Sequence, residues 1–294
     1  MPESPFPIRP AENHAATAFP FPVDLNLTSP QNPRVKLAVA LQDRRDRERE
    51  QLFLIEGYRA LTRALDRNWP IHELFVCPEL FQGENEPALI AACHERGAKV
   101  YTTPAHVFAK FAYRERPEGL VGVAPQRHLR PDDLKLPPNP LLLVAVAIEK
   151  PGNLGTILRS ADAAGVHGVL LCDRCTDLYN PNVVRASTGT IFSLPVAEAT
   201  SAEALAWLHA RGIRTLAATP HTDHLHTEVD MTSPLAVIVG CEMIGLSDDW
   251  LKGADLAVRI PMLGQADSLN VATATTILLY EAVRQRGVKH GSGL

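Results

Sequence analysis

Three short segments in the C-terminal half combine polar side chains with the ends of apolar runs. The first segment contains the amide of Asn153 and the guanidinium of Arg159. The second contains the carboxylate of Glu242 between two glycines, and the third contains the hydroxyl of Ser268 and the amide of Asn270. Each segment follows a run that predicts a strand, and open α/β sheets bind ligands at the carboxyl ends of their strands. We therefore expect a ligand site built from these three loops.

Each segment also has a purely structural interpretation. Asn153 can cap a helix that presents Arg159 on its surface. Ser247 and Ser268 can each be the N-cap of a following helix. The spacing in the first segment is not G-x-G-x-x-G, which argues against a dinucleotide-binding fold.

The apolar runs predict an α/β protein with a small N-terminal and a larger C-terminal domain. Strands are expected at 52–55, 73–76, 99–101 and 119–124, and then at 141–148, 169–172, 215–218, 235–239 and 256–260. Helices are expected at 57–67, 88–96, 154–164, 202–211 and 269–286. The later strands are continuous apolar runs, which is typical of a parallel sheet covered on both faces by helices.

The length of 294 residues favours two domains. We expect a flexible, proline-rich leader at 1–27, a smaller N-terminal domain at 28–128, a linker at 129–140 and a larger C-terminal domain at 141–294. The expected linker contains four prolines in a polar stretch, Pro131, Pro137, Pro138 and Pro140.

Composition excludes several classes of protein. No apolar run approaches the roughly 18 residues of a membrane span, so no membrane partner is expected. The five cysteines are scattered and odd in number, which argues against a disulfide scaffold and favours a reducing cytoplasm. With a net charge of −4 the chain does not coat nucleic acid by charge alone.

Two local excesses of positive charge mark where a polyanion would bind. Residues 34–67 contain 9 Lys and Arg against 6 Asp and Glu, and residues 110–130 contain 5 against 2. From charge alone, a solvated helix face is the simpler interpretation.

Two further clusters resemble metal sites but have plainer explanations. Cys172 and Cys175 have C-x-x-C spacing without a second pair at zinc-finger distance. His221, His224 and His226 fall in a polar connection between strands, where a solvated loop is favoured. We expect no metal site.

In their order along the chain, the three segments resemble the SpoU family of RNA ribose 2′-O-methyltransferases in the SPOUT superfamily. The matching motifs are Asn153-x-Gly155-x-x-x-Arg159, Gly240-x-Glu242-x-x-Gly245, and Ile260-Pro-Met-x-Gly264 with Ser268-Leu-Asn270-Val. The stretch 180–189 also matches, and the resemblance covers 141–286. Residues 28–125 resemble the substrate-binding domain that often precedes it. Cys241 departs from the Asn or Ser that is more usual there.

The resemblance implies a SPOUT domain with a parallel sheet and a trefoil knot, preceded by a small α/β domain like a ribosomal protein that binds RNA. It implies the cofactor S-adenosylmethionine, with contacts at Thr219, Gly240, Ile260 and Leu269. The catalytic set would be Asn153, Arg159, Glu242, Ser268 and Asn270. Family members are homodimers with the active site at or near the interface.

The implied reaction moves a methyl group from a sulfonium to a ribose 2′-hydroxyl. A guanidinium is a poor base at neutral pH, so we expect Arg159 to orient the ribose or its phosphate and to stabilise the developing alkoxide. The substrate would be structured RNA, with ribosomal RNA favoured over transfer RNA and no DNA. Phosphate contacts are expected from Arg34, Lys36, Arg44, Arg45, Arg47 and Arg49.

Two alternatives belong to other classes. One is an RNA-binding protein of the same fold without catalytic activity. The presence of all five candidate catalytic side chains argues against it. The other is a nicotinamide-dependent oxidoreductase on a doubly wound sheet, which the missing glycine fingerprint disfavours.

Overall fold

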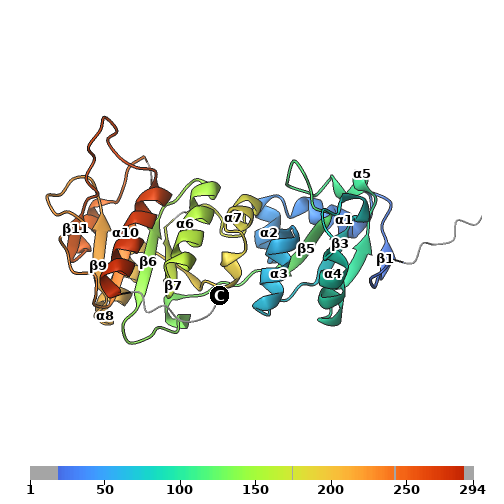
Figure 1. The fold of residues 1–294 in the computed structure, drawn as a ribbon, viewed down its shortest axis with the longest axis horizontal. Coiled ribbons are helices and arrows are strands. Elements are labelled where there is room, and N and C mark those ends of the chain that lie inside the picture. The colour runs from blue at the N-terminus through green and yellow to red at the C-terminus, as the bar shows by residue number, and fades with distance from the viewer. Residues whose placement is uncertain (1–18, 174, 242, 288–294) are drawn as a thin grey trace, which may run out of the picture.

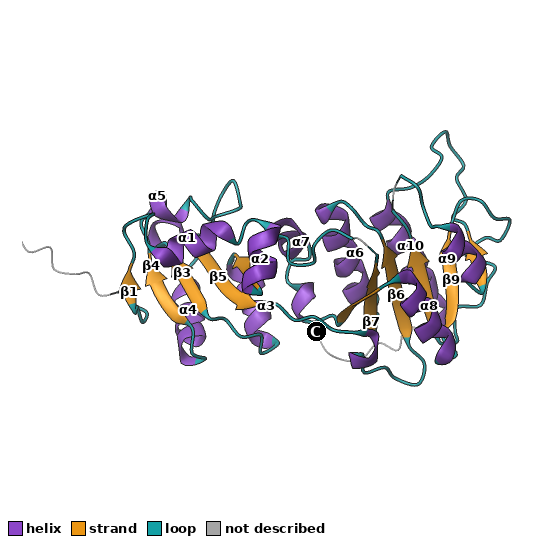
Figure 2. Ribbon diagram, turned by 180° about the vertical axis from the view of Figure 1, so that it is seen from behind, coloured by secondary structure: helices purple, strands orange, loops and turns teal. Residues whose placement is uncertain are grey.

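The computed structural model describes residues 19–173, 175–241 and 243–287. It contains two separate sheets, one of five strands and one of six, arranged along the long axis of an elongated molecule (Figure 1). Helices cover the faces of both sheets (Figure 2). The predicted division into two α/β halves agrees with this arrangement.

The N-terminal sheet is mixed, in the order β1-β4-β3-β5-β2. Its strands are β1 (Leu25–Asn26), β2 (Leu52–Glu56), β3 (Glu73–Val76), β4 (Lys99–Thr102) and β5 (Leu120–Pro125). β5 runs antiparallel to both β2 and β3, so these two strands end at the same edge of the sheet. The accompanying helices are α1 (Pro33–Ala40), α2 (Arg44–Glu50), α3 (Tyr58–Asp66), α4 (Glu86–Glu95) and α5 (Ala105–Phe108), with the 3-10 turn η1 (Pro78–Leu80).

The C-terminal sheet is parallel throughout, in the order β11-β9-β10-β6-β7-β8. Its strands are β6 (Leu141–Val146), β7 (Gly168–Cys172), β8 (Val196–Ala199), β9 (Arg214–Ala218), β10 (Leu235–Val239) and β11 (Leu256–Val258). Every residue of β6, β7 and β10 is buried, as the continuous apolar runs predict for central parallel strands.

Five helices and two 3-10 turns accompany this sheet in the described part of the chain. They are α6 (Pro151–Ala163), α7 (Pro181–Ala186), α8 (Ser201–Ala210), α9 (Asp248–Gly253), α10 (Val271–Arg286), η2 (Pro131–Asp133) and η3 (Thr190–Phe192). Residues 196–199 were not among the expected strands, because this edge strand has only two buried residues and thus lacks a long apolar run.

The two halves share an apolar contact. Phe53 of β2 packs on Tyr179 and Phe192 of the C-terminal half at ring distances of 4.6 and 6.3 Å. Trp69 contacts Phe192 at 5.3 Å. The hydroxyl of Tyr179 donates to the carbonyl of Arg127. These contacts join the two sheets through side chains far apart in the sequence.

Two predicted boundaries need correction. The flexible leader is expected to reach residue 27, but Phe21 is buried and β1 pairs with β4, so residues 19–27 pack on the N-terminal sheet. Residues 1–18 lie outside the described residues. The proline-rich linker is also packed, because Leu134 is buried in the C-terminal core and Leu129 forms a bridge with Ala197.

Among the described residues, no helix is long and apolar enough to cross a membrane.

Candidate active site

The three predicted loops meet at one edge of the C-terminal sheet. β6, β10, β9 and β11 are neighbours and run in parallel, so their carboxyl ends lie on the same edge. Thr219 directly follows β9, Gly240 directly follows β10, and Ile260 lies two residues beyond β11. The topology therefore brings together segments as far apart in the sequence as Asn153 and Asn270, which are 117 residues apart.

A side-chain hydrogen bond connects the first and third segments. Asn270 Nδ2 donates to Asn153 Oδ1 at 3.2 Å, joining the first turns of α6 and α10. The two helices also meet about two turns further on, where the hydroxyls of Ser160 and Thr276 are 2.7 Å apart. The candidate site at the carboxyl edge of the C-terminal sheet, called the carboxyl-edge site, is thus positioned by two helices that pack against each other.

The predicted helix caps are wrong in two places. α6 begins at Pro151 with Lys150 as its N-cap, so Asn153 lies inside the first turn and its side chain is not the cap. Proline suits this first position because its missing N–H has no helical partner there in any case. At α10 the cap is Asn270, whose side chain accepts the N–H of Ala272, and Ser268 lies two residues outside the helix.

Arg159 lies on α6 and is exposed to solvent. In the part of the chain that the structure describes, its guanidinium has no hydrogen bond or ion pair. Ser268 is also exposed. The predicted carboxylate Glu242 lies outside the described residues. The structure therefore brings Asn153 and Asn270 together and leaves Arg159 and Ser268 open to a ligand.

The loop after β10 closes tightly on itself. The N–H of Gly245 donates to the carbonyl of Cys241 at 3.0 Å. A Cβ at Gly240 would lie 2.4 Å from the backbone of Gly245, closer than real Cβ contacts. Gly240 is therefore required for this turn, as its position in the sequence motif suggests.

The loop between β11 and α10 has free backbone groups. From Pro261 to Leu269, no backbone N–H or C=O makes a hydrogen bond within the described residues. Leu263 is 97% exposed, and Met243 and Ile244 in the neighbouring loop are also exposed. The edge thus offers backbone donors and acceptors beside apolar side chains, which suits a ligand with both a polar heterocycle and an apolar part.

Arg47 does not belong to the predicted RNA surface. It is 1% exposed and forms an ion pair with Asp177 of the C-terminal half. Its Nη1 also donates to the carbonyls of Leu41 and Gln42. The sequence pattern of the basic run could not show this, because the burying partner is 130 residues away.

The other predicted RNA-binding side chains are exposed but differ in their partners. Arg34 pairs with Glu73, Arg44 with Glu48, and Arg49 with Asp46 and Glu50. The side chains of Lys36 and Arg45 have no such partner within the described residues.

The two metal-like clusters have specific local environments. Burial raises the pKa of the Cys175 thiol to about 11 and also raises the pKa of Cys172, so both stay protonated at neutral pH. His226 is buried rather than solvated as expected, and its Nδ1 has no hydrogen-bond partner in the described structure. The described residues contain no group of three or more possible metal ligands.

The fold and site define a two-domain α/β protein with a ligand site at the carboxyl edge of a parallel sheet. Residues 140–280 match the SpoU rRNA Methylase family, and residues 32–122 match the MRM3-like substrate binding domain. The chain belongs to the SpoU rRNA methylase family.

Its similarity to individual proteins extends over both domains. It is 35% identical to the 23S rRNA (uridine(2479)-2′-O)-methyltransferase of Streptomyces viridochromogenes, over 84% of this chain and 87% of that protein. It is 31% identical to the 23S rRNA (guanosine(2553)-2′-O)-methyltransferase RlmP of Bacillus subtilis, over 86% and 97%. The AdoMet-bound rRNA methyltransferase of Sinorhizobium meliloti superposes with a TM-score of 0.81 at 32% identity, covering 88% of this chain and 98% of that one.

Proposed function

We propose that this protein transfers a methyl group from S-adenosylmethionine to a ribose 2′-hydroxyl of RNA, with ribosomal RNA as the substrate. The observation that supports this most is the hydrogen bond between Asn153 and Asn270, which joins two family motifs. Arg159 lies on the same helix as Asn153 and has no side-chain partner among the described residues. Two relatives that match 84% and 86% of this chain are named as 23S rRNA 2′-O-methyltransferases.

The carboxyl-edge loops fit the proposed cofactor chemically. The unpaired backbone groups of the loop before α10 suit the polar edge of an adenine, and the exposed apolar side chains suit the rest of the molecule. Thr219, Gly240, Ile260 and Leu269 would hold it. When bound, S-adenosylmethionine supplies an activated methyl group, so the protein's main task is to align the acceptor.

Arg159 is assigned to the acceptor side of the site. A guanidinium is a donor and not a base, so Arg159 would orient the ribose or the adjacent phosphate and stabilise the negative charge that develops on the 2′-oxygen as its proton passes to water. Asn153 and Asn270 fix the start of α6 relative to α10. Ser268, and Glu242 outside the described residues, complete the proposed catalytic set.

The finer features of the architecture are also proposals. We assign a trefoil knot to the C-terminal domain, a ribosomal-protein-like fold to the N-terminal domain, and a domain boundary between residues 129 and 141. Exposed Lys36, Arg45, Arg34, Arg44 and Arg49 would contact RNA phosphates. A homodimer is supported by apolar side chains left exposed in the loops after β10 and β11 and on α10, namely Met243, Ile244, Leu263 and Tyr280.

The test is methyl transfer from labelled S-adenosylmethionine to 23S ribosomal RNA transcribed in vitro. The wild-type chain should label a ribose 2′-oxygen. Arg159→Ala should lower kcat by about 100-fold or more, because transition-state charge loses its partner, while cofactor affinity measured by calorimetry stays unchanged. Arg159→Lys retains charge but loses the planar fork, so near-normal activity of that variant would contradict the assigned role.

An inactive RNA-binding protein is the competing hypothesis. It would bind the RNA but transfer no label even with wild-type Arg159, and that result would overturn the proposed activity.

A further inference from the structure

A cleft with a cavity volume of about 420 Å³ lies where the two halves meet, away from the loops of the candidate active site. Its walls include three arginines from three separate segments: Arg59 in the first turn of α3, Arg114 in the loop before β5, and Arg185 on α7. Arg185 comes from the C-terminal half and the other two from the N-terminal half. The cleft therefore exists only because the two halves are packed together.

Arg114 is held in place by a local network. It forms an ion pair with Glu118, whose other oxygen accepts the N–H of Tyr58 at the start of α3. Gly57 makes room for this pair, because a Cβ there would lie 2.8 Å from both the guanidinium and the carboxylate. Burial lowers the pKa of Arg114, and repulsion from Arg185 and Arg59 adds to this effect. The three positive charges thus act on one another.

The carboxylates near the cleft are already engaged. Glu118 is paired with Arg114, and Glu86 accepts the N–H groups of Gln82 and Gly83 through one oxygen. The second oxygen of Glu86 is buried without a partner in the described structure. Glu56 accepts the N–H groups of Tyr113 and Arg114, and burial raises its pKa.

Arg59 and Arg185 are different. Both are exposed, and neither has an ion pair or hydrogen bond of its side chain within the described residues. They provide two guanidinium groups without a direct ion-pair partner among the described residues to one concave site, although Arg185 is close enough to Glu56 to lower the pKa of that carboxyl against the larger effect of burial. Guanidinium groups with free N–H donors are suited to phosphate recognition.

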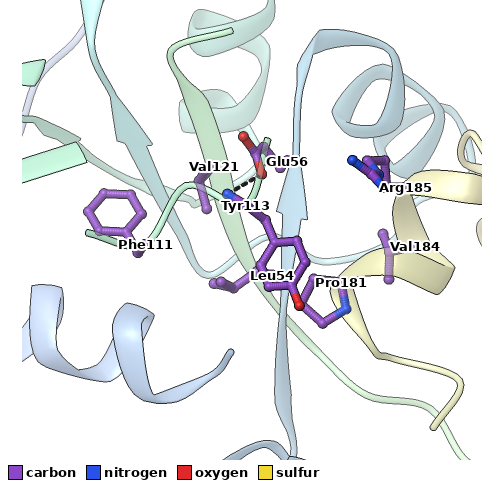
Figure 3. Close-up of a pocket in the computed structure, with 8 residues that line it drawn as sticks. All are labelled: Leu54, Glu56, Phe111, Tyr113, Val121, Pro181, Val184 and Arg185. Carbon is purple, nitrogen blue, oxygen red and sulfur yellow. Dashed lines mark hydrogen bonds between the residues drawn. The ribbon is translucent and has the colours of Figure 1, made fainter. Parts of the chain in front are cut away.

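An aromatic side chain lies next to this site. Tyr113 is 38% exposed, and its ring lies beside Leu54 of β2 and Pro181 of α7 (Figure 3). Tyr113 and Arg185 line the same small pocket. Exposed aromatic rings beside arginines are typical of surfaces on which single-stranded bases stack. The loop that contains Tyr113 lies on the same long side of the molecule as the loops after β10 and β11 (Figures 1 and 2).

We propose that this interdomain cleft binds a phosphodiester of the RNA strand between Arg59 and Arg185, with Tyr113 as a stacking surface for an adjacent base. The inference rests on the proposed function in taking RNA as the ligand. It adds a second contact region, so that RNA bound at the cleft extends along the molecule toward the carboxyl-edge site.

The experiment measures binding of fluorescently labelled poly(U) to the full-length protein, because phosphate contacts do not depend on sequence. Arg59→Gln and Arg185→Gln should each weaken binding several-fold and lower the slope of log affinity against log salt by about 1. Tyr113→Ala should weaken binding while Tyr113→Phe retains it. The matched control is Arg67→Gln, an exposed arginine just beyond the opposite end of α3.

The outcomes separate this inference from the proposed function. If Arg59→Gln and Arg185→Gln bind poly(U) as tightly as Arg67→Gln, with an unchanged salt slope, the cleft is not an RNA site, whatever the methyltransfer assay shows. If the cleft variants lose RNA binding but the wild-type protein transfers no methyl group, the cleft is supported as an RNA site and the proposed methyltransferase activity is contradicted. Unchanged thermal melting and cofactor affinity in both variants would confirm that the lost binding is local.

Discussion

The buried side chain of Arg47 connects the two domains through an ion pair with Asp177. Its Nε and Nη2 both donate to Asp177 Oδ2, at 2.8 and 2.6 Å, and its Nη1 reaches two carbonyls at the end of α1. Removal of the Arg47 side chain would break all four of these hydrogen bonds, and the side chain of Asp177 is itself largely buried. A buried charge without its partner is costly, so this pair specifies the interdomain arrangement more than it adds net stability.

Arg47→Ala should therefore lower the free energy of unfolding by about 3–5 kcal/mol, because it removes the charged partner of Asp177 and leaves Asp177 Oδ2 and two carbonyls without these donors. Urea denaturation followed by circular dichroism measures this loss. Arg45→Ala on the same helix is the control: Arg45 is exposed and unpaired by its side chain, so its replacement should change stability by less than about 0.5 kcal/mol. Equal midpoints for the two variants would show that the buried pair does not specify the junction.

The helices α6 and α7 lie between the domain junction and the candidate active site and pack closely against each other. Gly155 of α6 lies so close to α7 that a Cβ would be 2.5 Å from the Cβ of Ala186 and 2.9 Å from the carbonyl of Val183. The same helix α6 contains Asn153 and Arg159, and α7 contains Arg185 of the cleft. Close backbone packing thus sets the distance between the two proposed RNA contacts.

Gly155→Ala should destabilise the protein by about 1–3 kcal/mol, because overpacking at this contact outweighs the roughly 1 kcal/mol that alanine gains over glycine in a helix. It should also lower methyl transfer, since α6 must move away from α7. Gly152→Ala is the matched control on the same helix, where a Cβ meets nothing within 4 Å. That variant should be neutral or slightly more stable, and a similar loss in both would rule out the close contact as the cause. Thermal melting and activity of the two variants decide the point.

At the scale of the whole molecule, one apolar cluster includes buried residues from both halves, among them Phe53 of β2 and Leu143 of β6. The proposed RNA contacts and the methyl-donor edge are therefore presented by a joined pair of domains rather than by two independent modules. Four of the eight exposed large hydrophobic residues that the structure describes lie in the loops after β10 and β11 and on α10, which is the surface that we assign to the proposed dimer.

The proposed dimer can be tested by measuring the mass of the protein in solution. Light scattering of the protein at micromolar concentration should give twice the mass of one chain. Tyr280→Glu should shift the mass toward the monomer, because it places a charge in the proposed apolar interface. Val39→Glu, at an exposed apolar position on α1, should leave the dimer intact. A monomeric wild-type protein at all concentrations would contradict the assignment.

The sequence by itself determined the central strands, since β6 and β10 are apolar on both faces and need no partner to be recognised. It also determined the chemical types at the site, because motif spacing places them after strands. Only the tertiary structure decided which side chains meet: the Asn153–Asn270 hydrogen bond, the burial of Arg47 and His226, and the convergence of Arg59, Arg114 and Arg185. The physical reason is distance along the chain, because local pattern encodes the period of an element, whereas the environment of a side chain depends on residues brought to it from far away by packing.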